Sequence, residues 1–209
     1  MASIPAPQPR RTQAERRAES GDRLLAAAAT IIADEGYLAA TLERVGTSAG
    51  FSRGLASRKY GSKDGLIEAV IWRVSAHVHA EVDAAIAPCP TPLDQLLALF
   101  DRFVDLALRD TSVRAYFVLF SAMIANRLET RSVFDEVQQR FGGRIEDLVT
   151  SAQQAGQVPS ALPAQHIAFM VGCLLAGIAI ENATGIAEAA EPAVLRRDLG
   201  AMLRAALTG

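Results

Sequence analysis

Apolar residues recur at intervals of three and four positions through most of this chain of 209 residues, and glycine, proline or polar stretches separate the periodic segments. This interval is the period of an amphipathic α-helix, whereas a strand would alternate every second residue. We therefore expect an all-α protein of about nine helices, each ended by the breaks between periods. The expected ranges are 22–35, 42–49, 52–59, 62–85, 92–109, 112–127, 129–155, 163–184 and 191–207.

The segment 41–63, TLERVGTSAGFSRGLASRKYGSK, combines two short helices with a tight turn between them. Thr41 can cap the first helix, and Gly50 can adopt the left-handed conformation that lets the chain turn sharply. Phe51 then fills the angle between the two helices, and Ser52 can cap the second. This arrangement is a helix-turn-helix, which indicates DNA binding.

The second helix of this segment exposes hydroxyl and basic side chains and contains almost no acidic residue that would repel a polyanion. Such side chains donate hydrogen bonds to phosphates or to base edges. Gly54 allows either a close approach to the DNA backbone or packing against the preceding helix. The expected base contacts are Arg53, Ser57 and Arg58, and the expected phosphate contacts are Thr41, Ser52, Lys59, Tyr60 and Lys63.

The motifs over about residues 23–70 resemble the TetR-type transcriptional regulators in content and in order. They are Gly36-Tyr37, Thr41, Ala49-Gly50-Phe51-Ser52, Gly54 and Tyr60-Gly61-Ser62-Lys63. One position departs from the family pattern, because Ser57 and Lys59 stand where such regulators commonly carry two aromatic residues. We expect Arg58 and Lys59 to make charge contacts in their place. This departure leaves open a helical small-molecule or protein-binding module with a vestigial helix-turn-helix.

The resemblance implies a helix-turn-helix domain at 21–66 and a helical effector-binding and dimerisation domain at 67–209. The segment 1–20 is polar, contains prolines and lacks a period, which is typical of a mobile arm. The arm could enter a DNA minor groove or serve only as a soluble tail. Its basic residues are Arg10, Arg11, Arg16 and Arg17.

The net charge of −2 conceals an asymmetry between the two parts of the chain. Residues 1–63 carry ten basic and six acidic side chains, a net +4, and the remainder carries −6. The basic part contains the helix-turn-helix, so its field favours a polyanion there, although an ordinary solvated surface would explain so modest an asymmetry too. The start of the sequence lacks the apolar run of a secretory signal, so we expect a cytoplasmic protein.

The middle helices contain aromatic residues at helical spacing, which more often form a core than a pocket. The resemblance, however, implies an effector cavity in this region, and few charged residues lie along the inner faces. We expect a mostly apolar small-molecule effector of unknown identity. The candidate pocket residues are Trp72, Phe103, Tyr116 and Phe120.

The segment 167–180 is apolar nearly all round but shorter than the ~20 residues that a bilayer span needs. We expect a buried helix and no membrane contact. Either a monomer core or a homodimer interface formed by the last two helices would cover it. A twofold dimer would place two recognition helices roughly 34–36 Å apart, which suits a palindromic operator. The candidate interface residues are Phe169, Gly172, Ala176, Gly177 and Ile180.

An enzyme is the remaining alternative, because His77 and Glu81 lie on one helix face and His79 lies between them. A histidine and a carboxylate four residues apart can bind a metal, but no third ligand is evident. Cys89 and Cys173 are best interpreted as small apolar side chains. We therefore expect no metal, no cofactor and no catalysis, and predict a one-component transcriptional regulator, more specifically a repressor released by its effector.

Overall fold

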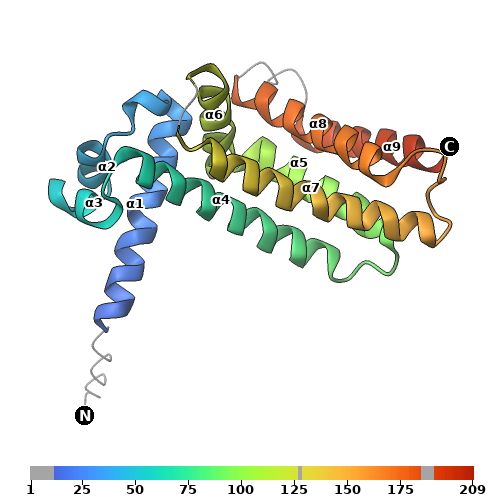
Figure 1. The fold of residues 1–209 in the computed structure, drawn as a ribbon, viewed down its shortest axis with the longest axis horizontal. Coiled ribbons are helices and arrows are strands. Elements are labelled where there is room, and N and C mark those ends of the chain that lie inside the picture. The colour runs from blue at the N-terminus through green and yellow to red at the C-terminus, as the bar shows by residue number, and fades with distance from the viewer. Residues whose placement is uncertain (1–11, 127–128, 185–190) are drawn as a thin grey trace, which may run out of the picture.

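The computed structural model describes residues 12–126, 129–184 and 191–209, and these residues form nine α-helices, one short 3-10 helix and no strand (Figure 1). The prediction of an all-α fold is confirmed. Apart from the first helix, the predicted helix ends differ from the observed ones by no more than two residues. The elements are α1 (Gln13–Glu35), η1 (Tyr37–Ala39), α2 (Leu42–Ser48), α3 (Arg53–Tyr60), α4 (Lys63–Ile86), α5 (Pro92–Arg109), α6 (Thr111–Asn126), α7 (Arg131–Gln154), α8 (Ala164–Ala183) and α9 (Pro192–Thr208).

Helix α1 begins at Gln13 rather than at Asp22, so the prediction of an arm is wrong for residues 13–20. A capping box starts the helix: the Thr12 hydroxyl accepts from the Glu15 amide at 3.2 Å, and the Glu15 carboxylate accepts from the Thr12 amide at 2.7 Å. Arg16 and Arg17 therefore lie on a helix. The predicted arm residues Arg10 and Arg11 lie outside the described part of the chain.

Helices α1, α2 and α3 pack into a small N-terminal domain at one end of the molecule (Figure 1). Gly50 takes the turn between α2 and α3 with φ of 76°, a conformation that glycine adopts without strain. The Arg23 side chain, from α1, donates to the Ala49 carbonyl at 2.7 Å and lies 4.6 Å from the centre of the Phe51 ring. Helix α1 thus holds the turn in place from outside the motif.

The remaining helices form a bundle around α5, which contacts α4, α6, α7, α8 and α9. Helix α5 can be central because one of its faces is apolar along its whole length, and Leu96, Leu99 and Phe100 on that face are fully buried. Helix α4 runs from the N-terminal domain along the bundle (Figure 1). Helix α6 packs against α1 as well as against α8. The two domains are therefore joined through α4 and through α6.

Helix α8 buries only one of its faces, through residues such as Val171 and Leu175. Its outer face leaves Phe169 73% exposed and Met170 51% exposed. The alternative of a monomer core is therefore wrong for this face, because no other described helix covers it, and the homodimer interface stays a prediction. Within the described residues, α8 is the one helix long and apolar enough to cross a membrane; its buried face packs against α6 and α7.

Candidate DNA-binding surface and effector cavity

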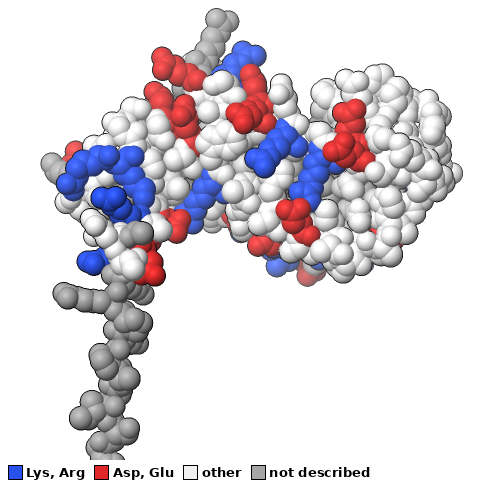
Figure 2. Space-filling view, turned by 60° about the horizontal axis from the view of Figure 1, so that its bottom comes forward, with Lys and Arg blue, Asp and Glu red and all other residues white. Residues whose placement is uncertain are grey.

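Lys and Arg side chains gather at the end of the molecule that carries the helix-turn-helix (Figure 2). On α3 the side chains of Ser57 and Arg58 are exposed, as is that of Ser52 at the helix start. The Ser52 hydroxyl makes no capping bond within the described residues, so it is free for another acceptor or donor. Arg53 is the first residue of α3, but its side chain lies outside the described part of the structure.

Gly54 lies on the exposed side of α3. A Cβ atom built there would meet no described heavy atom within 4 Å. The interpretation of Gly54 as a packing residue against the preceding helix is therefore wrong. The Arg58 Nε donates to the Gly54 carbonyl at 3.3 Å, which holds the Arg58 side chain along its own helix in the free protein.

Lys59 and Tyr60, which the sequence indicated as phosphate contacts, connect α3 to α1 in this structure. Lys59 Nζ donates to the Arg17 carbonyl at 2.8 Å, and Tyr60 Oη donates to the Gly21 carbonyl at 3.3 Å. Burial raises the pKa of Tyr60. A Cβ at Gly21 would lie 2.3 Å from Lys59 Nζ, so the glycine provides the space for this contact. Sequence reasoning missed these links because they join residues about 40 positions apart.

Thr41 and Lys63 flank the motif, and each already has an internal contact. The Thr41 hydroxyl accepts from the Arg44 amide at 3.2 Å and so caps α2, as expected, while it can still donate outward. Lys63 Nζ lies 3.9 Å from the centre of the Tyr37 ring and donates to the Leu38 carbonyl at 3.4 Å. Burial lowers the pKa of Lys63. The phosphate roles of both residues stay predictions.

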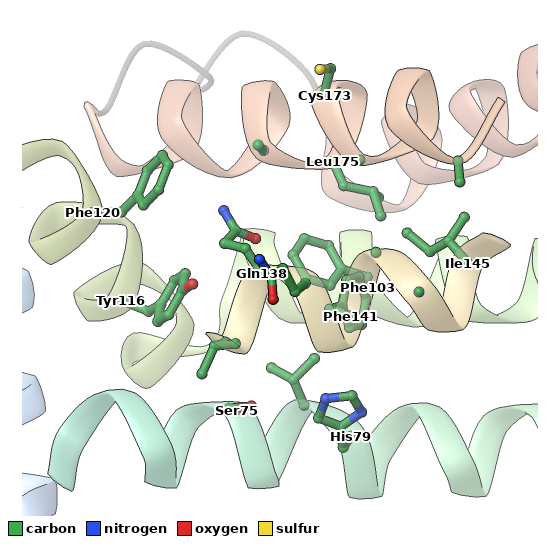
Figure 3. A pocket seen from close by; sticks show the side chains of 18 of the residues that line it. Ser75, His79, Phe103, Tyr116, Phe120, Gln138, Phe141, Ile145, Cys173 and Leu175 are labelled. Carbon is green, nitrogen blue, oxygen red and sulfur yellow. The ribbon is translucent and has the colours of Figure 1, made fainter. Parts of the chain in front are cut away.

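A cavity of about 640 Å³ lies in the larger domain among α4, α5, α6, α7 and α8 (Figure 3). Its walls are mostly apolar. Rings of Phe103 and Phe141 pack at 5.2 Å between centres, and Tyr116 packs on Phe117 at the same distance. Gly142 and Gly172 also line it, and an added Cβ at either would meet no described atom within 4 Å.

Phe103, Tyr116 and Phe120 line this cavity, whereas Trp72 does not. The placement of Trp72 in the pocket is wrong because the residue lies one turn nearer the N-terminal domain than Ser75, the first polar lining residue of α4. Trp72 is half-buried and packs on the core. Phe141, Gly142 and Gly143 also line the cavity but were not predicted from the sequence. The two adjacent glycines within a helix were the sign in the sequence that side chains leave space there.

Two buried polar atoms of the lining, Tyr116 Oη and His79 Nε2, have no hydrogen-bond partner among the described residues. Tyr116 is only 6% exposed, and burial strongly raises the pKa of its hydroxyl, which therefore stays protonated. Burial, with the nearby Arg144 and Arg140 cations, lowers the pKa of His79, so this ring is neutral at physiological pH. Both groups are uncharged and able to donate.

The three residues considered as a metal site have other partners. His77 Nε2 lies 2.9 Å from Asp110 Oδ2, Glu81 pairs with Arg102, and His79 Nδ1 lies 3.4 Å from Arg144 Nη1. Within the described residues no three histidine, cysteine or carboxylate side chains converge. The arrangement interpreted as a candidate metal site is thus a set of contacts between helices.

Large apolar side chains remain exposed on the last two helices. They include Phe169 and Met170 on α8 and Val194 and Met202 on α9. Of the small residues expected at an interface, Gly177 is exposed, while Gly172 and Ala176 are half-buried and also line the cavity; Ile180 is half-buried. This face remains the predicted dimer interface.

Comparison with known proteins identifies the motif and the fold. Residues 24–70 match the model of bacterial regulatory proteins of the tetR family. No curated protein sequence matches the chain. Among solved structures, a bacterial regulatory protein in the tetR family from Rhodococcus RHA1 is 18% identical with a TM-score of 0.73 and covers 90% of this chain and 97% of its own.

Two further similar structures contain ligands. The transcriptional regulator FadR from Bacillus subtilis, in complex with stearoyl-CoA, is 15% identical with a TM-score of 0.73, covering 87% of this chain and 96% of its own. AibR, in complex with isovaleryl coenzyme A and operator DNA, is 16% identical with a TM-score of 0.71, covering 88% and 97%. The helix-turn-helix of this protein thus matches the tetR family model over residues 24–70, and its fold is similar to that of tetR-family transcriptional regulators along nearly the whole chain.

Proposed function

We propose that this chain is a homodimeric, cytoplasmic repressor that binds a palindromic operator and releases it when a mostly apolar small molecule occupies the cavity. The observation that carries the proposal is the position of α6 between the cavity and the DNA-binding domain. One side of α6 supplies Val113, Tyr116 and Phe120 to the cavity wall. The helix also packs along α1, where Arg114 pairs with Asp34.

A ligand that displaces the cavity wall would therefore move α1. Lys59 and Tyr60 connect α3, the recognition helix of the helix-turn-helix, to α1, so α3 would move together with α1. Helix α4 offers a second route, because it begins at Lys63 beside η1 and supplies Ser75 and His79 to the cavity. In a twofold dimer such a movement changes the separation of two recognition helices, and DNA affinity falls.

At the DNA end, we propose that Arg53, Ser57 and Arg58 contact base edges and that Thr41 and Ser52 contact phosphates. Lys59, Tyr60 and Lys63 would contact phosphates only after giving up or sharing their present acceptors. The exposed apolar face of α8 and α9 supports dimerisation, since leaving Phe169 and its neighbours in water would be unfavourable. The ligands named in the FadR and AibR structures support an effector with an apolar body.

The test is a fluorescence-anisotropy titration of the purified protein against its own upstream intergenic DNA and against random DNA, at two salt concentrations. We expect tight, sequence-selective and salt-sensitive binding by a dimer, with the dimer verified by light scattering. Equal affinity for both DNAs would reject the regulator and favour the vestigial-motif alternative. Selective binding by a monomer would reject only the dimer.

A further inference from the structure

The chemistry of the effector can be inferred from the polar atoms of the cavity, provided that the cavity is the effector site proposed above. Buried polar atoms in folded proteins nearly always have a hydrogen-bond partner. Tyr116 Oη, from α6, and His79 Nε2, from α4, lack one among the described residues, and both residues line the cavity. In Figure 3 the Tyr116 ring extends into the cavity from α6 at the left, and the His79 ring extends into it from α4 below. A ligand is the natural partner for both atoms.

The direction of these hydrogen bonds follows from the neighbours of each group. Arg144 Nη1 lies 3.4 Å from His79 Nδ1, and an arginine can only donate. His79 Nδ1 is therefore the acceptor, and the ring proton lies on Nε2, which then donates into the cavity. Burial lowers the pKa of His79, as do the nearby Arg144 and Arg140 cations, and these effects outweigh Asp83, which raises it, so the ring is neutral. The Tyr116 hydroxyl is protonated as well, so both groups offer a proton.

The charge of the ligand follows from the rest of the lining. Among the described lining residues there is no lysine or arginine, and Glu146 is the one acidic residue. Arg144 lies nearby but pairs with Asp83, so it is already neutralised. A carboxylate or phosphate inside the cavity would lose its hydration with no cation to replace it.

We infer that the effector is an uncharged, mostly apolar molecule, such as a ketone, ester or lactone, whose oxygen atoms accept hydrogen bonds from Tyr116 Oη and His79 Nε2. Such an effector differs from the acyl-CoA molecules in the FadR and AibR structures, because the phosphates of coenzyme A have no cationic partner in this lining. The apolar walls contact the hydrocarbon part of the ligand, and the two donors favour a ligand that carries oxygen acceptors.

Displacement of the dye N-phenyl-1-naphthylamine from the full-length protein tests this inference. The competitors share a carbon chain: octane, 2-octanone, octanoate and octanoyl-CoA. We expect 2-octanone to displace the dye at a concentration about tenfold lower than octane does, the typical worth of one hydrogen bond. Octanoate and octanoyl-CoA should be weaker than the ketone.

The variants Tyr116→Phe and His79→Phe each remove one donor and keep a ring. Tyr116→Phe should fold normally, because it deletes a hydroxyl without a partner and retains the packing on Phe117. At least one of the two variants should abolish the advantage of 2-octanone while octane binds as before. Tyr37→Phe, a hydroxyl deletion outside the cavity, is the matched control and should retain the advantage.

The outcomes separate this inference from the proposed function. Dye displacement without preference for the ketone, a preference for octanoyl-CoA, or an unchanged preference in both variants would overturn the inference and leave the effector cavity standing. If neither the dye nor any competitor binds, the effector cavity itself is rejected, and the inference with it.

Discussion

Two substitutions of Gly142 test two properties separately: the stability of α7 and the binding of a ligand in the cavity. Gly142 lies in the middle of α7 and lines the cavity. A Cβ there would meet no described atom within 4 Å, so a side chain can be added without displacing a neighbour. Glycine in a helix interior costs about 1 kcal/mol relative to alanine. We therefore expect Gly142→Ala to raise the free energy of unfolding by about that amount.

For a chain of this size, 1 kcal/mol corresponds to a rise in melting temperature of roughly 2–4 °C. A larger side chain at the same position should fill the ligand space. We expect Gly142→Leu to fold at least as stably as the wild type, to bind the dye about tenfold or more weakly, and to retain operator affinity while losing its response to ligand.

The assays are urea unfolding followed by circular dichroism, dye titration and anisotropy with operator DNA. Gly200→Ala is the matched control, because Gly200 is also helical with open space around its Cβ but does not line the cavity. It should raise stability similarly and leave dye affinity unchanged. A loss of stability in Gly142→Ala would contradict the claim that a side chain can be added here without displacing a neighbour. Undiminished dye binding by Gly142→Leu would show that the ligand does not bind in this cavity.

Four further predictions concern other residues. Arg58→Ala should weaken specific DNA binding by ~1–3 kcal/mol, whereas Lys63→Ala should weaken binding to all DNA and flatten its salt dependence; equal losses of Arg58→Ala on operator and random DNA would contradict its base contact. Gly65→Ala should lower the free energy of unfolding by about 1–3 kcal/mol in a urea titration, because its Cβ would lie 2.4 Å from a backbone carbonyl oxygen; wild-type stability would show that this contact relaxes freely. Because the pKa of His79 is lowered in the folded protein, the unfolded chain binds more protons near its ordinary pKa of about 6.5, so stability should fall as the pH drops through that value. His79→Gln should reduce this dependence when urea midpoints at about pH 7.5 and 5.5 are compared, and an identical slope in the variant would assign the effect elsewhere. Phe169→Lys should shift the protein toward a monomer in light scattering and weaken operator binding, and an intact dimer would place the interface on another face.

The helices and the helix-turn-helix could be predicted from the sequence because their causes are local. Periodicity, Thr41 as a cap and Gly50 as a turn residue act within a few positions. The start of α1 also has a local cause, because Thr12 and Glu15 form a capping box. This signal was overlooked because the prolines before it favoured the interpretation of the whole segment as an arm.

Tertiary contacts were not predictable in the same way. The acceptors of Lys59 and Tyr60 are backbone carbonyls of α1. Every residue has such a carbonyl, so the sequence does not indicate which one accepts a hydrogen bond. His77 and Glu81 resembled a metal-binding pair because the pattern does not reveal that Asp110 lies beside His77 and Arg102 beside Glu81. Empty space is likewise absent from a sequence, except where glycines such as Gly142 interrupt a helix that would otherwise prefer alanine.

Trp72 is the single tryptophan of the chain, and it lies on α4 between the DNA-binding domain and the cavity. Its intrinsic emission therefore comes from one known position. Because Trp72 does not line the cavity, a bound ligand would not alter its spectrum by touching it. A change in its emission on ligand addition would instead report that α4 has shifted against the core. The unlabelled protein thus contains an optical probe of the proposed step between effector binding and DNA release.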